Sequence, residues 1–321
     1  MHGSAQEVIK GLHESGDVIV EPIGGHAVKL PPFAYRAPES LEEALALLDE
    51  HGEDARVLAG GQSLVPLLAL RLARPALLVD LGRVPGLAAL RESDGGVALG
   101  PMVRERAAER SELVRRRAPL LNEAIQLIGH PAIRSRGTVG GSLAHADPAA
   151  ELPAVAVALE AELVATSADR AERVIPAADF FRGYFTTALR PEEVLTEVRI
   201  PPSMPGTGVC FEEAVRRHGD FAMVGVAATV RLAAGIIAEA RLALTGVADA
   251  PVRPAEAEKG LVGALPDAAS FEAAAAAATR QLAPPSDLHA SSGYRRHVAG
   301  VLVRRALQTA SRRAREATGG A

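Results

Sequence analysis

Two short glycine-rich turns constrain this chain more than any other feature of its sequence. The first, Ala59-Gly60-Gly61-Gln62-Ser63, follows an apolar run, and the second, Thr138-Val139-Gly140-Gly141-Ser142, lies within the stretch 134–153. A Gly-Gly turn between a strand and a helix offers successive N–H groups and the positive end of a helix dipole, which suit a pyrophosphate. Two such turns suggest a pair of backbone concavities that face one phosphate-bearing ligand.

A plain tight turn without a ligand is the alternative interpretation of each Gly-Gly pair. Neither turn has the pattern G-x-x-x-x-G-K-[ST] or G-x-G-x-x-G, so P-loop and Rossmann sites are disfavoured. Glycine would let a phosphate approach the backbone, and the hydroxyls of Ser63, Thr138 and Ser142 would add donors. The spacing alone leaves both interpretations open.

Two carboxylates, Asp147 and Glu151, follow the second turn and precede the apolar residues 152–157. Either could accept a hydrogen bond from a ligand. Asp147 could equally begin a helix as its N-cap, with Glu151 in the first turn. His130 and His145 flank the turn, and as isolated histidines we interpret them as structural or solvent-facing.

The composition excludes several classes of function. The net charge is −4 with both signs interspersed, so no basic field is available for nucleic acid or anionic lipid. The single cysteine, Cys210, excludes a disulfide framework and a thiolate cage for a metal or an iron–sulfur cluster. No apolar run reaches the length of a membrane span, and the first residues lack a signal-peptide pattern. We therefore expect a cytoplasmic, metal-free globular protein that holds a cofactor.

Hydrophobic periodicity predicts helices alternating with strands. A helix should begin at Ser40, its N-cap, and end at Gly52. The other predicted helices are 64–72, 103–111, 119–128, 254–264, 270–282 and 294–310, and residues 155–166 should pass from helix to strand. The predicted strands are 55–59, 76–81, 95–100, 194–200, 208–215, 224–232 and 238–247, and the proline-rich residues 201–208 form the best linker.

Several motifs, taken in order, resemble the FAD-binding medium subunits of molybdenum hydroxylases, the group that includes carbon monoxide dehydrogenase and the flavin domain of xanthine dehydrogenase. They are Pro31-Pro-Phe-Ala-Tyr35, Val57-Leu-Ala-Gly-Gly-Gln-Ser63, Arg136-Gly-Thr-Val-Gly-Gly-Ser142, Arg190-Pro-Glu-Glu-Val-Leu195, Arg216-Arg-His-Gly-Asp-Phe221 and Tyr294-Arg-Arg. The resemblance covers residues 30–310. Ser142 stands where the family commonly has Asn, and Glu151 where it often has Asp.

The resemblance implies an α+β fold. A two-lobed FAD-binding domain of the vanillyl-alcohol-oxidase-like (PCMH) type would precede a C-terminal domain with a three-stranded antiparallel sheet and helices. We expect a poorly ordered or non-native extension at 1–29, the FAD-binding domain at 30–203 with lobes at about 30–82 and 83–203, the C-terminal domain at 204–312, and a frayed tail at 313–321.

The resemblance also implies a binding site for FAD. The FAD diphosphate would lie between residues 59–64 and 138–142, Glu151 would lie close to the flavin, and Phe221 would lie over the isoalloxazine. The predicted cofactor-binding set is Ala59, Gly60, Gly61, Gln62, Ser63, Leu64, Ile128, Thr138, Val139, Gly140, Gly141, Ser142, Asp147, Glu151, Leu195 and Phe221. No catalytic residue and no metal ligand is predicted.

The function implied is electron transfer. The chain would accept electrons from [2Fe–2S] clusters of a small partner subunit, beside a large molybdopterin subunit, in a dimer of heterotrimers. FAD would pass them to an external acceptor such as NAD, a quinone or oxygen, with no nucleic acid and no membrane span involved. Two alternatives stay open: a stand-alone FAD-dependent oxidase or reductase on the same fold, and a non-enzymatic assembly protein.

Overall fold

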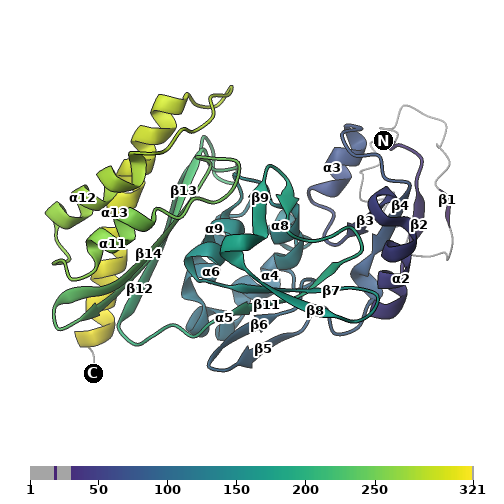
Figure 1. The fold of residues 1–321 in the computed structure, drawn as a ribbon, viewed down its shortest axis with the longest axis horizontal. Helices are drawn as coiled ribbons and strands as arrows, with labels where there is room; N and C mark the ends of the chain where they lie inside the picture. The colour runs from purple at the N-terminus through teal and green to yellow at the C-terminus, as the bar shows by residue number, and fades with distance from the viewer. Residues whose placement is uncertain (1–17, 20–29, 320–321) are drawn as a thin grey trace.

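The computed structural model describes residues 18–19 and 30–319 (Figure 1). Val18–Ile19 form the short strand β1, which pairs with β2. The rest of the extension predicted at 1–29 lies outside the described residues. At the other end, α13 runs from Ser292 to Gly319, so residues 313–319, which we expected to fray, are helical.

A small sheet at one end of the molecule carries the first glycine turn. Its strand order is β1-β2-β4-β3, with β2 at Ala34–Arg36, β3 at Ala55–Leu58 and β4 at Leu77–Asp80. Strands β2 and β3 both run parallel to β4, so their carboxyl ends share one edge of the sheet. The turn that follows β3 therefore projects from that edge.

Helices α2 (Leu41–His51) and α3 (Leu64–Ala69) belong to this N-terminal part. The predicted N-cap of α2 is confirmed, because the hydroxyl of Ser40 accepts a hydrogen bond from the N–H of Glu43 at 3.1 Å. The carboxylate of Glu43 in turn accepts from the N–H of Glu39, one residue before the cap. Helix α3 ends at Ala69, earlier than predicted.

The middle of the chain forms a five-stranded antiparallel sheet of order β5-β6-β11-β7-β8. Its strands are Leu90–Ser93, Gly96–Leu99, Val194–Ile200, Glu162–Thr166 and Glu172–Pro176, respectively. The helices here are α4 (Glu105–Arg110), α5 (Glu112–Arg117), α6 (Pro119–Ile125), α7 (Pro131–Arg134), α8 (Val139–His145), α9 (Glu151–Ala158) and α10 (Ala177–Phe180). A small hairpin, β9 (Phe181–Gly183) and β10 (Thr186–Thr187), follows α10.

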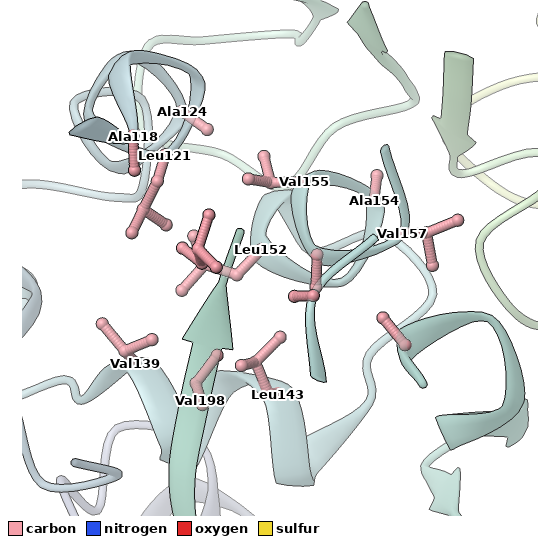
Figure 2. Packing of buried hydrophobic residues seen from close by; sticks show 14 of the residues in the cluster. Ala118, Leu121, Ala124, Val139, Leu143, Leu152, Ala154, Val155, Val157 and Val198 are labelled. Atoms are coloured by element: carbon pink, nitrogen blue, oxygen red, sulfur yellow. The ribbon is translucent and has the colours of Figure 1, made fainter. Parts of the chain in front are cut away.

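Helix α9 is buried on all sides and lies at the centre of the hydrophobic core in the middle of the molecule. Figure 2 shows Leu152 and Val155 of α9 packed with Leu121 of α6 and Leu143 of α8. Sequence reasoning missed α8 because it begins at the second Gly-Gly pair, and glycine weakens a helix interior. Tertiary packing of Val139 and Leu143, both almost completely buried, overrides that preference.

The C-terminal part has the predicted three-stranded antiparallel sheet, β12 (Thr207–Ala214), β13 (Val224–Ala233) and β14 (Ile236–Thr245). Helices α11 (Ala255–Leu261) and α13 lie against one face, with α12 (Ala268–Thr279) packed against these two helices, and α6 and α9 lie against the other face (Figure 1). Alternate residues follow this division: Phe211 joins the middle core, whereas Cys210 joins the core under α13. No helix within the described ranges is long and apolar enough to cross a membrane.

Candidate functional site

The first glycine turn, residues 59–64, presents free backbone donors. Among the residues that the structure describes, no group accepts a hydrogen bond from the N–H groups of Gly60, Gly61, Gln62, Ser63 and Leu64. Gly61 has φ +72°, a conformation that favours glycine. All six residues of the turn are only half-buried, so an anion can reach these N–H groups.

The second glycine turn is different, because it is the first turn of helix α8 and its donors are already used. Thr138 is the N-cap, and its hydroxyl accepts from the N–H of Gly141 at 3.0 Å. The N–H groups of Val139, Gly140 and Ser142 donate to the carbonyls of Val103, Pro101 and Thr138, respectively. The hypothesis that both turns offer free backbone N–H groups to one phosphate-bearing ligand therefore holds for the first turn and not for the second. The hydroxyl of Ser142, which is half-buried and has no hydrogen-bond partner in the described chain, remains available here.

The two turns touch each other directly. A methyl group placed on Gly60 would lie 2.9 Å from the Cα atom of Gly137 and closer still to the carbonyl oxygen of Arg136. A methyl group on Gly141 would lie 3.5 Å from the Cβ atom of Ala59. We call the contact between Gly60 and residues 136–137 the seam. It joins the N-terminal sheet to the middle of the molecule, so the predicted convergence of the two turns is present.

Residues 104 and 105 support the seam from behind. Arg104 and Thr138 form an isolated antiparallel bridge, and the N–H of Glu105 donates to the carbonyl of Gly137 at 3.0 Å. The guanidinium of Arg104 donates to the carbonyl of Arg136. Sequence reasoning missed Arg104 and Glu105, because their spacing along the chain does not predict their contacts with residues 136–138.

Two buried carboxyl groups, those of Glu105 and Glu151, and the half-buried Glu213 converge beside the second turn. Burial raises the pKa of Glu151, in the first turn of α9, to about 8, and the nearby Glu213 and Glu105 raise it further. Burial also raises the pKa of Glu105 to about 8, although the charge of Arg134 opposes that shift. The pKa of Glu213, on β12, is raised by burial to about 7.

Two of these carboxyl groups have an oxygen without a partner. Oε2 of Glu105 and Oε2 of Glu213 are buried and accept no hydrogen bond within the described residues. Glu213, Gly225 and Thr245 are neighbours across β12, β13 and β14, and the Thr245 hydroxyl donates to the carbonyl of Ala150 at 2.9 Å. The C-terminal sheet therefore faces the start of α9. Buried unpaired oxygens of this kind suit a ligand that brings hydrogen-bond donors.

Asp147 does not cap helix α9, whose N-cap is Ala150. Its carboxylate instead accepts from the N–H of Ala149 at 2.9 Å and shapes the turn before the helix. The interpretation of Asp147 as an N-cap is therefore wrong, whereas the placement of Glu151 in the first turn is confirmed.

The apolar candidates lie in different surroundings. Leu195 is buried in the middle core, and Ile128 packs half-buried against the same core. Phe221 is 61% exposed and ends the turn 216–221. That turn docks onto the loop before α7, because a methyl group on Gly219 would lie 2.8 Å from the ring of His130. The structure thus brings the segments that carry Ile128 and Phe221 together.

No group of His, Cys, Asp or Glu side chains suited to a metal occurs in the described ranges.

The Glu151 carboxyl should make the stability of the chain depend on pH. Its pKa is raised from 4.5 to about 8 in the folded state, so folding binds a proton between these values. The free energy of unfolding should fall by a few kcal/mol as pH rises through that window. In Glu151→Gln the fall should be smaller, when melting temperatures are compared at several pH values from pH 5 to 9. The exposed Glu162→Gln is the control. Equal pH profiles for Glu151→Gln and the wild type would contradict this assignment.

Comparisons with known proteins find similar domains over most of the chain. Residues 31–203 match the family model described as the FAD binding domain in molybdopterin dehydrogenase, and residues 209–310 match the CO dehydrogenase flavoprotein C-terminal domain. The chain is 44% identical to the 6-hydroxypseudooxynicotine dehydrogenase complex subunit alpha of Paenarthrobacter nicotinovorans, over 90% of this chain and 97% of that protein. It is 40% identical to the carbon monoxide dehydrogenase medium chain of Hydrogenophaga pseudoflava, over 87% and 97%. A solved structure of carbon monoxide dehydrogenase from Hydrogenophaga pseudoflava has a chain that superposes with a TM-score of 0.87 at 41% identity, covering 89% of this chain and 99% of that one.

Proposed function

Because the chain belongs to the family of FAD-binding medium subunits of molybdenum hydroxylases, we propose that it transfers electrons within a multi-subunit complex. As an FAD-binding oxidoreductase subunit, it would accept electrons from [2Fe–2S] clusters of a partner and deliver them to an external acceptor. We propose the domain division 30–203 and 204–312 for this role. The observation that carries the proposal is the row of five free N–H groups at 60–64, which lies at the seam.

The polarity of the site fits FAD. The diphosphate of FAD is an acceptor with two negative charges, and the N–H groups of residues 60–64, which have no acceptor among the described residues, are donors. The ribityl hydroxyls and the imide N–H of FAD are donors, and the unpaired oxygens of Glu105 and Glu213 are acceptors. The site thus offers both the donors and the acceptors that FAD needs.

The residues of this chain would bind and orient the cofactor. We propose that residues 59–64 hold the diphosphate, that Thr138 to Ser142 support them, and that Glu151 lies near the flavin ring. Asp147, Ile128, Leu195 and Phe221 complete the proposed set. Bound FAD supplies the capacity to exchange electrons with donors and acceptors of different kinds, and the protein supplies position and electrostatic environment.

The partners are part of the proposal. Cys210 is the only cysteine and is buried, and burial raises its pKa to about 12, so this chain cannot ligate an iron–sulfur cluster. We propose a small [2Fe–2S] subunit and a large molybdopterin subunit as partners, in a dimer of heterotrimers, with NAD, a quinone or oxygen as the final acceptor. We propose the cytoplasm as its compartment.

One observation favours a second candidate, a stand-alone FAD-dependent oxidase or reductase. Such an enzyme needs its own acid or base beside the flavin. The carboxyl groups of Glu105, Glu151 and Glu213, with pKa values raised to about 8, 8 and 7, could serve that purpose.

Co-expression with the neighbouring reading frames separates the two candidates. We expect the purified chain to carry one FAD and to turn over no substrate alone, and to join a complex with an iron–sulfur and a molybdopterin protein. Substrate turnover by the chain alone would favour the oxidase. A chain without flavin absorbance, and with none after incubation with FAD, would contradict the proposed function and favour a non-enzymatic assembly protein.

A further inference from the structure

A cavity lies between the middle of the molecule and the C-terminal sheet, away from the two glycine turns. It has a volume of about 50 Å³, and about 10–15 Å³ of such space holds one water. Its floor is the sheet, and its opposite wall includes Pro119 of α6 and Leu159 at the end of α9. The linker residues 201–204 close a further side. The cavity therefore has room for a molecule of a few heavy atoms.

The floor continues the face of the sheet that packs on α6 and α9. Val209 of β12 belongs to the middle core, and it is paired across the strands with Thr229, which is paired with Arg241. Side chains two residues apart on a strand share a face, so Arg231 and Glu239 extend this floor. The face thus changes from apolar under α9 to polar in the cavity.

Thr229 is a buried polar group without a partner. Its side chain is only 7% exposed, and its hydroxyl forms no hydrogen bond with any residue that the structure describes. It is also the only polar side chain in the segment 224–230 of β13, where another apolar residue would complete the strand. A buried hydroxyl of this kind calls for a partner that the chain itself does not supply.

The arginines around Thr229 have more donors than the chain uses. The cavity is lined by one acid, Glu239, and by three arginines, Arg117, Arg231 and Arg241. The guanidinium of Arg231 makes one hydrogen bond within the described chain, from Nε to Glu239 at 3.4 Å, and its terminal nitrogens have no acceptor. Glu239 also pairs with Arg241 at 2.5 Å, so two cations share one carboxylate.

Acids outside the cavity hold the other two arginines. Arg117 pairs with Glu92 at 2.5 Å, and Arg241 pairs with Glu160 at 3.0 Å. Arg231 has only the shared carboxylate of Glu239 and is therefore the arginine with the most unused donors. Since the groups without partners are N–H and O–H groups, a ligand here must bring acceptors.

We propose that this cavity binds a small organic carboxylate. Its carboxylate group would accept hydrogen bonds from Thr229 and Arg231, because a guanidinium group binds a carboxylate through charge-assisted hydrogen bonds. Its short apolar body would lie against Leu159 and Pro119 on the opposite wall. The donors on one wall and the apolar groups on the other match the two ends of such an acid.

The proposed ligand would bind apart from the cofactor. Glu151 begins α9 and Leu159 follows its last residue, so they lie about 12 Å apart along the helix axis at 1.5 Å per residue. Strand β12 likewise runs from Val209 at the cavity to Glu213 at the buried carboxyl groups. The ligand would therefore bind whether or not the chain carries FAD.

The test is a titration of the full-length chain with propionate, acetate and inorganic phosphate, at an ionic strength held constant with chloride. Propionate should raise the melting temperature in a saturable way. Acetate has one CH₂ group fewer and should bind about three- to fourfold more weakly.

Two variants locate the ligand. Thr229→Val keeps the shape of the side chain and removes the hydroxyl, and Arg231→Gln removes the guanidinium group. Each should raise the dissociation constant of propionate about tenfold. Arg304→Gln is the matched control, because it breaks an ion pair of similar kind, to Glu272 at 2.6 Å, on the outer helices α12 and α13.

Three results would overturn the proposal. If chloride stabilises the chain as much as propionate does, the effect is screening of surface charge and no site exists. Tighter binding of phosphate than of propionate would rule out an organic acid as the ligand. If Thr229→Val and Arg231→Gln bind propionate as tightly as Arg304→Gln does, the acid binds elsewhere on the chain.

Discussion

Replacing Gly60 with valine is expected to weaken FAD binding about a hundredfold. The added carbon atoms would collide with the carbonyl oxygen of Arg136 and the Cα atom of Gly137. Both are backbone atoms, which cannot rotate away, so the two turns would have to separate. Overpacking of this kind costs about 1–3 kcal/mol, and the loss of the seam should weaken FAD binding about a hundredfold. Calorimetric titration of the FAD-free chain measures this loss.

Gly260→Ala is the matched control for Gly60→Val. Gly260 lies in α11, and a methyl group placed on it would meet no atom within 4 Å. Alanine in a helix interior should stabilise the chain by about 0.5–1 kcal/mol and leave FAD binding unchanged. Wild-type affinity in Gly60→Val would show that the seam is dispensable for the cofactor.

Removing the side chain of Arg134 should be the most destabilising single change near the site. Arg134 is buried, and its guanidinium donates to the carboxylate of Glu109 at 2.9 and 3.4 Å. It also donates to the carbonyls of Ile128 at 2.8 Å and Gly129 at 3.3 Å, which fixes the loop before α7. Arg134→Ala leaves these acceptors buried without their donor. We expect a loss of about 3–5 kcal/mol in the free energy of unfolding, measured by urea denaturation.

Arg106→Ala provides the comparison, because Arg106 pairs with the same Glu109 carboxylate at 2.6 Å from a more exposed position. Such a pair contributes only about 0–1 kcal/mol. Arg134→Lys should retain part of the stability, since lysine keeps the charge but not the planar fork. Equal losses in Arg134→Ala and Arg106→Ala would mean that the position of Arg134 confers no special stability.

The strands and helices that sequence reasoning predicted are those with strong local patterns. The apolar runs of β3, β4 and β11 and the long alternating strands of the C-terminal sheet are at or near their predicted positions. Strand β5 was missed because its middle residues, Arg91 and Glu92, are exposed and polar. Helix α5 was missed because Ser111, interpreted as the end of a helix, is the N-cap of the next one and accepts from Val114.

The residues of the candidate site are of two kinds: those that the local sequence indicates, and those that only the fold brings together. The two glycine turns were recognisable because a glycine pair between apolar runs indicates a turn from the local sequence alone. Glu105, Glu213 and Arg104 belong to the site only because distant segments pack together. Their spacing along the chain does not predict those contacts. Likewise, only the structure shows that the N–H groups of the second turn are engaged by Pro101 and Val103.

We propose that the N–H groups of residues 60–64 hold the diphosphate of FAD. Residue-resolved hydrogen exchange of the chain, with and without saturating FAD, tests it most directly. We expect the amides of Gly60 to Leu64 to exchange quickly without FAD, because they have no partner in the described chain, and to exchange much more slowly when FAD is bound. The amides of Gly140 and Gly141, which already have acceptors, should be protected in both states. Stoichiometric FAD binding with unchanged exchange at residues 60–64 would show that these amides do not hold the diphosphate.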